Sequence, residues 1–573
     1  MSRFRPLFRG FLSFLALGLF ASDAQAEVDK TVHNLAVRLN AKSDERVDSC
    51  IFCHTPHNGN PSKALWNRAL SGNSYKLYES PTLEAILDQP TGSSRLCLSC
   101  HDGTIALEDL RVKPKGGRFA LGYVAGKSSL STDLSDDHPV SFLYNSALAQ
   151  RQGELADPAL LAPNITLDRT GQLQCTSCHD PHEDRTPKFL VTENKFSQLC
   201  VGCHQMKGWP FSVHATSTAT WKGVGRNPWG DSDLQTVGEN GCGNCHRVHS
   251  AGRPQWLLNF GEEKKNCLVC HSGSGSSKDM EREFKKFSAH PIEQTAWVHR
   301  PKEEPGLMGR HVTCSDCHNP HAAGSASDNP DPLPAALRGA QGINASGTKT
   351  AQVSYEYEVC FACHGVTDQS KAAVIRKDHV TNARVEFNPG NRSSHPVVAP
   401  GTNPAAADME AGYTSSSMIQ CSDCHSSDNR AVRGPHGSRY EPILEREYQL
   451  QDPSPDSYQA YALCYKCHNR TSILSDRNGF PHRLHVVDAK ASCATCHDAH
   501  GSRNSAYLIN FMVRTKTGYP VVSPSKTGRL EFQDLGQGKG QCSLSCHGRD
   551  HDPEVYPPPP PPVEPPKTDP PTK

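Results

Sequence analysis

The feature that most constrains this chain is a short pattern, two cysteines separated by two residues and followed at once by histidine. The 573 residues contain it eleven times, and a twelfth copy is one residue longer. The paired cysteines are Cys50 and Cys53, Cys97 and Cys100, Cys175 and Cys178, Cys200 and Cys203, Cys242 and Cys245, Cys267 and Cys270, Cys314 and Cys317, Cys360 and Cys363, Cys421 and Cys424, Cys464 and Cys467, Cys493 and Cys496, and, in the longer copy, Cys542 and Cys546. The histidines that follow them are His54, His101, His179, His204, His246, His271, His318, His364, His425, His468, His497 and His547. No cysteine is left over among the 24, and the regular spacing argues against a disulfide framework.

The spacing has a mechanical reason. Cysteines three positions apart lie on one face of a helical turn, where both thiols reach the two vinyl groups of one porphyrin. The histidine that follows then points its imidazole at the iron as the proximal ligand. Zinc ribbons also use paired cysteines, but they need no histidine directly after each pair. The motifs therefore predict about twelve covalently bound haem c groups, with a local disulfide as the alternative at Cys542 and Cys546.

Composition agrees with this prediction. Hydrophobic residues make up only 36% of the chain, and it contains 44 glycines and 43 prolines. Apolar side chains are too sparse to fill several large cores, whereas porphyrins are large apolar bodies that could take their place. We therefore expect mostly irregular coil with short α-helices, in an extended array of six dihaem repeats organised around a stacked haem chain.

Two recurring contexts account for twelve of the histidines outside the motifs. Those of the first set, the close histidines, stand three residues after a motif histidine, or after an eight-residue insertion in the case of His436: His57, His182, His249, His321, His436 and His500. Those of the second set, the preceding histidines, stand ahead of the motif pairs: His33, His138, His214, His290, His395 and His485. Their number equals the number of predicted irons, so we predict that they are the distal ligands. His482 is an equal alternative to His485, and the methionines share no common context.

The close histidines carry a geometric consequence. A histidine three residues beyond a proximal ligand cannot reach the opposite face of its own haem, so it must ligate another. Repeated along the chain, this rule predicts a continuous row of closely packed haems. His299, His311, His379, His482 and His551 are then surplus, and we expect them at the surface, or one of them on a haem of a neighbouring subunit.

The motifs divide the chain into predicted segments. A basic start with an apolar run and the small-x-small stretch Ala24-Gln25-Ala26 predicts a signal peptide over residues 1–26, and the run is too short to span a bilayer. The predicted dihaem repeats cover residues 27–130, 131–207, 208–275, 276–370, 371–475 and 476–553. Residues 554–573, rich in proline, are predicted to form a disordered tail. The protein should be exported, to the periplasm, the outer membrane or the cell exterior.

Net charge excludes one class of partner. Lys and Arg number 60 and Asp and Glu number 60, so no basic surface favours nucleic acid.

Stretches such as Cys97-Leu-Ser-Cys-His, Asp136-Asp-His-Pro-Val and Cys175-Thr-Ser-Cys-His-Asp-Pro-His resemble the multihaem c-type cytochromes with a doubled CxxCH motif of metal-reducing bacteria. This resemblance implies bis-histidine, low-spin haems of low potential, and electron transfer in anaerobic respiration or to extracellular acceptors. It implies other redox proteins as partners, periplasmic or outer-membrane cytochromes and a porin conduit among them, and no enzymatic activity.

Two alternatives stay open at this point. Some relatives polymerise, so a filament-forming conductor is one alternative. A multihaem reductase is the other, and it requires one haem with an open coordination position. A stoichiometric high-spin ferric signal in electron paramagnetic resonance would favour the reductase.

Overall fold

The computed structural model describes residues 27–37, 47–60, 65–114, 120–224, 227–229, 232–294, 312–324, 333–365, 374–380, 382–401, 408–414 and 417–557. All twelve motifs lie in these ranges. The predicted signal peptide, His299, His311 and residues 558–573 of the predicted tail lie outside them.

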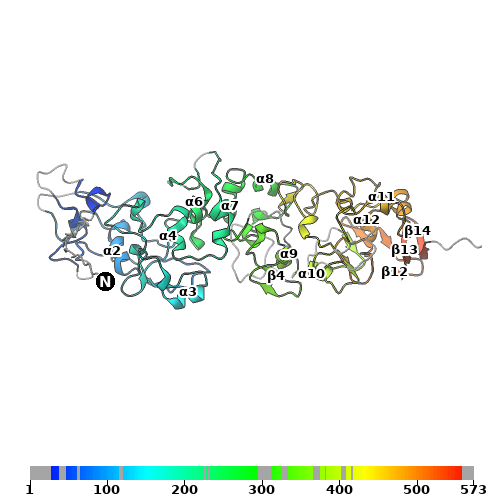
Figure 1. The fold of residues 1–573 in the computed structure, drawn as a ribbon, viewed down its shortest axis with the longest axis horizontal. Coiled ribbons are helices and arrows are strands. Elements are labelled where there is room, and N and C mark those ends of the chain that lie inside the picture. The colour runs from blue at the N-terminus through cyan, green and yellow to red at the C-terminus, as the bar shows by residue number, and fades with distance from the viewer. Residues whose placement is uncertain are drawn as a thin grey trace, which may run out of the picture. The chain divides into compact units, whose positions relative to one another are not determined.

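Short helices joined by long loops make up most of the described chain (Figure 1). The α-helices are α2 (Gly92–His101), α3 (Ser146–Gln152), α4 (Gln198–Val201), α5 (Val213–Thr216), α6 (Val237–Asn240), α7 (Glu263–His271), α8 (Met280–Phe284), α9 (Glu356–His364), α10 (Ala383–Glu386), α11 (Arg470–Ile473) and α12 (Cys493–Cys496). Single turns of 3₁₀-helix are η1 (Glu27–Lys30), η2 (Ser49–Phe52), η3 (Gly126–Ser128), η4 (Pro158–Leu160), η5 (Cys175–Ser177), η6 (Pro187–Phe189), η7 (Lys195–Ser197), η8 (Trp209–Phe211), η9 (Gly241–Asn244), η10 (Gln255–Leu257), η11 (Ile292–Gln294), η13 (Cys314–Asp316), η14 (Ala335–Leu337), η15 (Cys421–Asp423) and η16 (Cys464–Lys466), and η17 (Leu484–Asp488) is a π-turn.

Each of the eleven regular motifs begins inside one of these helical turns. In η13, for example, the amides of Cys317 and His318 donate to the carbonyl of Cys314 at 3.3 and 3.0 Å. Thr313 and Asp316 form a capping box at the start of this turn. The turn therefore places the two thiols three residues apart on one face, as the spacing predicts.

Strands are short except at the C-terminal end of the chain. They are β1 (Phe142–Leu143), β2 (Gln172–Leu173), β3 (Ser288–Ala289), β4 (Gly342–Ile343), β5 (Lys349–Thr350), β6 (Val374–Arg376), β7 (Ser393–Ser394), β8 (Gly437–Ser438), β9 (Gly501–Ser502), β10 (Met512–Thr515), β11 (Val522–Ser523), β12 (Glu531–Gly536), β13 (Lys539–Cys546) and β14 (Arg549–Tyr556). The pairs β3–β8, β4–β5, β6–β10 and β7–β9 are antiparallel.

The C-terminal sheet was not expected from the sequence. Strand β13 pairs antiparallel with β11, β12 and β14 (Figure 1). Its apolar face joins Leu544 to Phe511 and Val522 in a small buried cluster. Strand β14 continues to Tyr556, so residues 554–556 of the predicted disordered tail are ordered in this sheet.

The chain divides into two compact units. Unit 1 contains residues 1–74, 90–131 and 163–193, and unit 2 contains residues 75–89, 132–162 and 194–573. Their apolar clusters are small: in unit 1 Ala36, Phe52 and Leu110, and in unit 2, among others, a cluster around Tyr357 and Phe361. Such clusters agree with the low apolar content of the sequence.

The prediction of irregular coil with short helices is confirmed, and the organisation into six dihaem repeats stays a prediction. Within the described residues, no helix is long and apolar enough to cross a membrane.

Candidate haem-binding sites

Opposed pairs of imidazoles are the main feature of both units. Nine of the eleven regular motif histidines face a second histidine with ring centres 6.1–6.4 Å apart, and every second histidine belongs to one of the two sets singled out in the sequence. Unit 1 contains His54 opposite His182 and His101 opposite His33. Unit 2 contains His204 opposite His138, His246 opposite His321, His271 opposite His214, His318 opposite His436, His364 opposite His290, His425 opposite His500 and His468 opposite His395.

This separation fits one metal atom between the rings. A metal–imidazole nitrogen bond is about 2 Å and the ring centre lies about 1.2 Å behind the nitrogen, so two rings on one metal have centres about 6.4 Å apart. The spacing is too wide for direct ring stacking and is nearly constant across the nine pairs. The separation of the ring centres would therefore suit an iron held by the two imidazoles of each pair.

Hydrogen bonds orient these rings. Nδ1 of His101, His179, His246, His318, His425 and His497 lies 2.7–2.9 Å from a backbone carbonyl oxygen. Three of the preceding histidines also place Nδ1 2.7–2.9 Å from a backbone carbonyl oxygen. These are His214 with Pro320, His290 with Pro435 and His485 with Pro481. Because a carbonyl can only accept, the proton is on Nδ1, and Nε2 keeps its lone pair for a metal.

Burial keeps the imidazoles neutral. It lowers the pKa of His204, His271, His321, His425, His436, His468 and His497 to about 4. Nearby imidazoles lower these values further. A neutral imidazole is the form that ligates a metal.

Carboxylates orient some of the close histidines. Nδ1 of His500 lies 2.7 Å from Glu386 and that of His182 lies 3.0 Å from Asp180. Burial acts to lower the pKa of His500, but the hydrogen bond and charge of Glu386, together with the charge of Asp498, raise this pKa above its usual value. A carboxylate on the far nitrogen makes an imidazole a stronger metal ligand.

The two histidine sets pair in different directions. A preceding histidine faces the second motif of its own predicted repeat, as His33 faces His101. A close histidine faces the first motif of the repeat before it, as His321 faces His246 and His436 faces His318. The close histidines therefore link successive repeats, a direction that the sequence left open.

Thiols of successive motifs also meet. Five pairs are in hydrogen-bonding contact: Cys97 with Cys175, Cys200 with Cys242, Cys267 with Cys314, Cys360 with Cys421, and Cys464 with Cys493. Each pair joins the second motif of one predicted repeat to the first motif of the next. No disulfide bond joins any of the 24 cysteines, all of which lie in described residues.

His436 is held in place despite the insertion before it. The buried carboxylate of Glu283 in α8 accepts hydrogen bonds from Ser427 and Asn429. Lys286 bridges Glu283 and Asp428 at 2.5 and 2.6 Å. These contacts fix the inserted loop so that His436 faces His318, 6.1 Å between ring centres.

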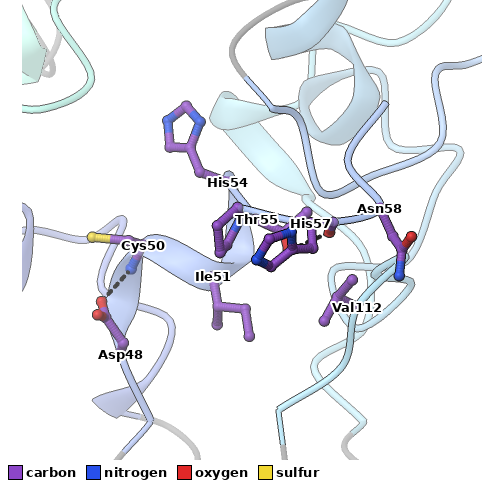
Figure 2. A pocket seen from close by; sticks show the side chains of 9 residues that line it. Asp48, Cys50, Ile51, His54, Thr55, His57, Asn58 and Val112 are labelled. Atoms are coloured by element: carbon purple, nitrogen blue, oxygen red, sulfur yellow. Dashed lines mark hydrogen bonds between the residues drawn. The ribbon is translucent and has the colours of Figure 1, made fainter. Parts of the chain in front are cut away.

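In unit 1, Nδ1 of His179 lies 2.9 Å from the carbonyl oxygen of Lys188. In unit 2, Nδ1 of His249 lies 3.1 Å from the carboxylate of Asp137. His57 is exposed on the rim of a cavity of about 370 Å³ lined by Cys50, His54 and Val112, and Figure 2 shows its ring pointing away from that of His54. His57 has no opposed imidazole among the described residues.

The sequence left His482 and His485 as alternatives for one distal ligand, and the structure places them beside different histidines. After burial, the largest influence on the lowered pKa of His497 is His482. His485 instead faces His551, with ring centres 6.4 Å apart. Both candidates therefore lie near another imidazole, and His551, which the sequence left as surplus, is buried.

The twelfth motif differs from the other eleven in its backbone. Cys542 and Cys546 lie on β13 rather than in a helical turn. Four residues of strand span about 13 Å, against about 5 Å for three residues of a helical turn. The extended strand therefore fits attachment of one porphyrin through both thiols less well than the regular motifs do.

Comparisons with known proteins agree with the motif pattern. The family described as Doubled CXXCH motif matches residues 169–208 and 235–276. A relative named multiheme cytochrome MtrA, from Shewanella baltica strain OS185, is 28% identical over 167 residues, which cover 27% of this chain. The match spans 38% of the length of that relative. The similarity to multihaem c-type cytochromes inferred from the motifs is thereby confirmed.

Proposed function

We propose, from this similarity to multihaem c-type cytochromes, that the chain transfers electrons along a row of about twelve covalently bound haem c groups. Bound haem iron supplies a one-electron step between its ferric and ferrous forms. The protein supplies two thioether-forming thiols and two imidazoles for each group, and it carries out no chemistry on a substrate.

The opposed imidazoles are the observation that carries this proposal. In nine pairs both coordination positions of an iron would be filled by protein nitrogen. A substrate-reducing haem enzyme needs an open position on the iron. Filled positions favour electron transfer over catalysis.

The thiol contacts support a continuous row in each unit. Where two thiols touch, as Cys267 and Cys314 do, the porphyrins attached to them would meet at their edges. Within a predicted repeat, the neighbouring thiols also interact, as Cys245 and Cys270 do. The row would then follow the order of the motifs in the chain.

Two of the remaining histidines are assigned from their surroundings. We assign His482 to the iron of His497, because His482 lies near enough to that imidazole to lower its pKa. We assign His57 to no iron, because it is exposed and has no opposed imidazole among the described residues.

The biological role that we propose is anaerobic respiration or extracellular electron transfer by an exported protein. Its partners would be other redox proteins, periplasmic or outer-membrane cytochromes, with a porin conduit as a further partner. Cell fractionation with antibody detection tests this location, and recovery of the protein in the cytoplasm would contradict it.

Coulometric titration of the purified holoprotein tests the function. With haem counted by intact mass and pyridine haemochrome, the expected uptake is about twelve electrons per molecule, one per haem. Reduced protein should reoxidise with a soluble oxidised cytochrome and show no turnover of nitrite or hydroxylamine. Colourless protein, or steady turnover of either substrate, would contradict the proposal.

A further inference from the structure

Six of the eleven regular motif histidines share one hydrogen-bonding pattern, and His547 departs from it at Nε2. In six regular motifs Nδ1 donates to a backbone carbonyl and Nε2 remains for a metal, as in His318, whose Nδ1 lies 2.9 Å from Ala336 O. In His547, Nδ1 lies 3.0 Å from Ala489 O, and Nε2 is also engaged, by the carboxylate of Asp452. Neither ring nitrogen of His547 has its lone pair directed at a free site.

Asp452 is buried and held in place by further hydrogen bonds, so its contact with His547 is part of the folded structure. Its side chain is 2% exposed, and it also accepts from the backbone amide of Ser492 at 3.1 Å and from the hydroxyl of Thr495. Removing His547 from Asp452 would take one hydrogen-bond partner from a buried carboxylate, and this loss destabilises the folded state. His547 is therefore held as an anchor of the turn between β13 and β14.

His551 has the geometry that His547 lacks. Its ring centre lies 6.4 Å from that of His485, at the upper end of the 6.1–6.4 Å found in the nine regular pairs. Nδ1 of His485 lies 2.9 Å from Pro481 O, and Nδ1 of His551 faces the Glu554 carboxylate at 3.9 Å. Nδ1 of His485 thus has a backbone acceptor, as in six of the regular motif histidines, and Nδ1 of His551 lies near a carboxylate beyond hydrogen-bond distance.

The sheet register places His551 beside the two thiols. His551 of β14 pairs directly with Leu544 of β13. Paired residues of antiparallel strands point to the same side, and Cys546, two residues after Leu544, shares its face. The pairing is irregular between Cys542 and Leu544, but both Cys542 and Cys546 pack against the apolar cluster of Leu544. The face that carries both thiols therefore also carries His551.

We propose that the iron of the last haem lies between His485 and His551, and that His547 does not ligate it. A thiol of this strand, Cys542 or Cys546, would attach the haem c, because the extended strand keeps the two thiols too far apart to reach both vinyl groups of one porphyrin. The inference rests on the proposed function, because it assumes that the chain binds haem c. It assigns a ligand role to a histidine that the motif pattern leaves out.

Substitution of His551 tests the proposal. In the ferric holoprotein, His551→Ala should keep the haem count of the parent protein and convert about one haem in twelve from low-spin to high-spin, as measured by integrated electron paramagnetic resonance. His485→Ala should give the same signal. The matched control is His379→Ala, an exposed histidine outside both sets, which should leave every haem low-spin.

A methionine at the same position separates ligation from a structural role. His551→Met should keep all haems low-spin and raise the reduction potential of one of them, because a thioether ligand favours ferrous iron. A histidine that only filled space would give no such single-haem shift.

The haem count and the spin state distinguish the proposal about His551 from the proposed function of the whole chain. A fully low-spin His551→Ala protein, or a parent protein with eleven haems, would overturn this proposal and leave the proposed function intact. Parent protein without haem would overturn the proposed function itself.

Discussion

The site around Cys314 and the site around Cys542 contain the same residue types on different backbones. In the first, a capped 3₁₀ turn places the thiols on one face, and the hydrogen bond from Nδ1 of His318 to Ala336 O leaves Nε2 available for a metal between this ring and that of His436. In the second, a strand spreads the thiols along one face and Asp452 takes the histidine that follows them. One inserted residue accompanies the change from a three-residue helical spacing to a four-residue strand spacing, and in our proposal the iron ligand lies on the neighbouring strand.

The largest expected difference concerns the cysteines. Replacing Cys314 and Cys317 by serine should remove one haem and lower the free energy of unfolding by ~3 kcal/mol or more, because a buried apolar body larger than a phenylalanine is lost. Replacing Cys542 and Cys546 should also remove one haem but destabilise less, because Leu544, Phe511 and Val522 form an apolar cluster of their own. Intact mass and chemical denaturation measure both, and equal destabilisation would break the comparison.

Loss of one distal imidazole should come next. His436→Ala removes the ring opposite His318 and should turn one haem high-spin without loss of any haem. His57→Ala is the control, since His57 is exposed and has no opposed imidazole in the described chain. Low-temperature spectra of the two ferric variants measure the effect, and a high-spin signal from His57→Ala would show that the pairing directions are misassigned.

A smaller change should follow from the carboxylate behind His500. The Glu386 hydrogen bond of 2.7 Å raises the pKa of His500, so Glu386→Gln should weaken its imidazole as a ligand for ferric iron. A tenfold change in the ferric-to-ferrous preference raises the potential of that haem by about 60 mV. Spectroelectrochemical titration detects this shift, and an unchanged set of potentials would argue that His500 ligates no iron.

The smallest effect should come from the surface of the hairpin. Arg549 and Glu554 form an ion pair at 3.4 Å with both side chains more than half exposed. Arg549→Ala should change the free energy of unfolding by less than about 0.5 kcal/mol. Leu544→Ala, in the buried face of the same sheet, should cost about 2–4 kcal/mol by comparison. Denaturant titration measures the free energy of unfolding of both variants. A larger loss in Arg549→Ala than in Leu544→Ala would contradict this prediction.

The sequence predicted which histidines lie opposite one another better than it predicted the direction of the pairing. All nine opposed pairs combine a motif histidine with a member of the two predicted sets, because motif chemistry is local and visible in the spacing. The direction in which a close histidine such as His321 pairs depends on how successive repeats stack, and no local pattern encodes that. His57 shows that local sequence alone does not predict a pair. His57 and His182 both stand three residues after a motif histidine, but His182 faces His54 whereas His57 is exposed.

Two sequence patterns near the C-terminal end are typical of the strands found there, although the haem motifs alone do not indicate them. Cys542-Ser-Leu-Ser-Cys546 alternates as a strand does, and Gly536-Gln-Gly538 is typical of a tight turn between strands. His551 follows the last motif histidine by four residues, close to the three-residue spacing of the close histidines. Its pairing with Leu544 becomes visible only once the strand register is known.

Integrated low-temperature electron paramagnetic resonance of the fully oxidised protein tests the central claim most directly. If two imidazoles enclose every iron, the spectrum contains low-spin ferric haem alone, in an amount equal to the haem count from intact mass. A high-spin signal amounting to several haems per molecule would mean that the opposed histidines do not hold iron between them.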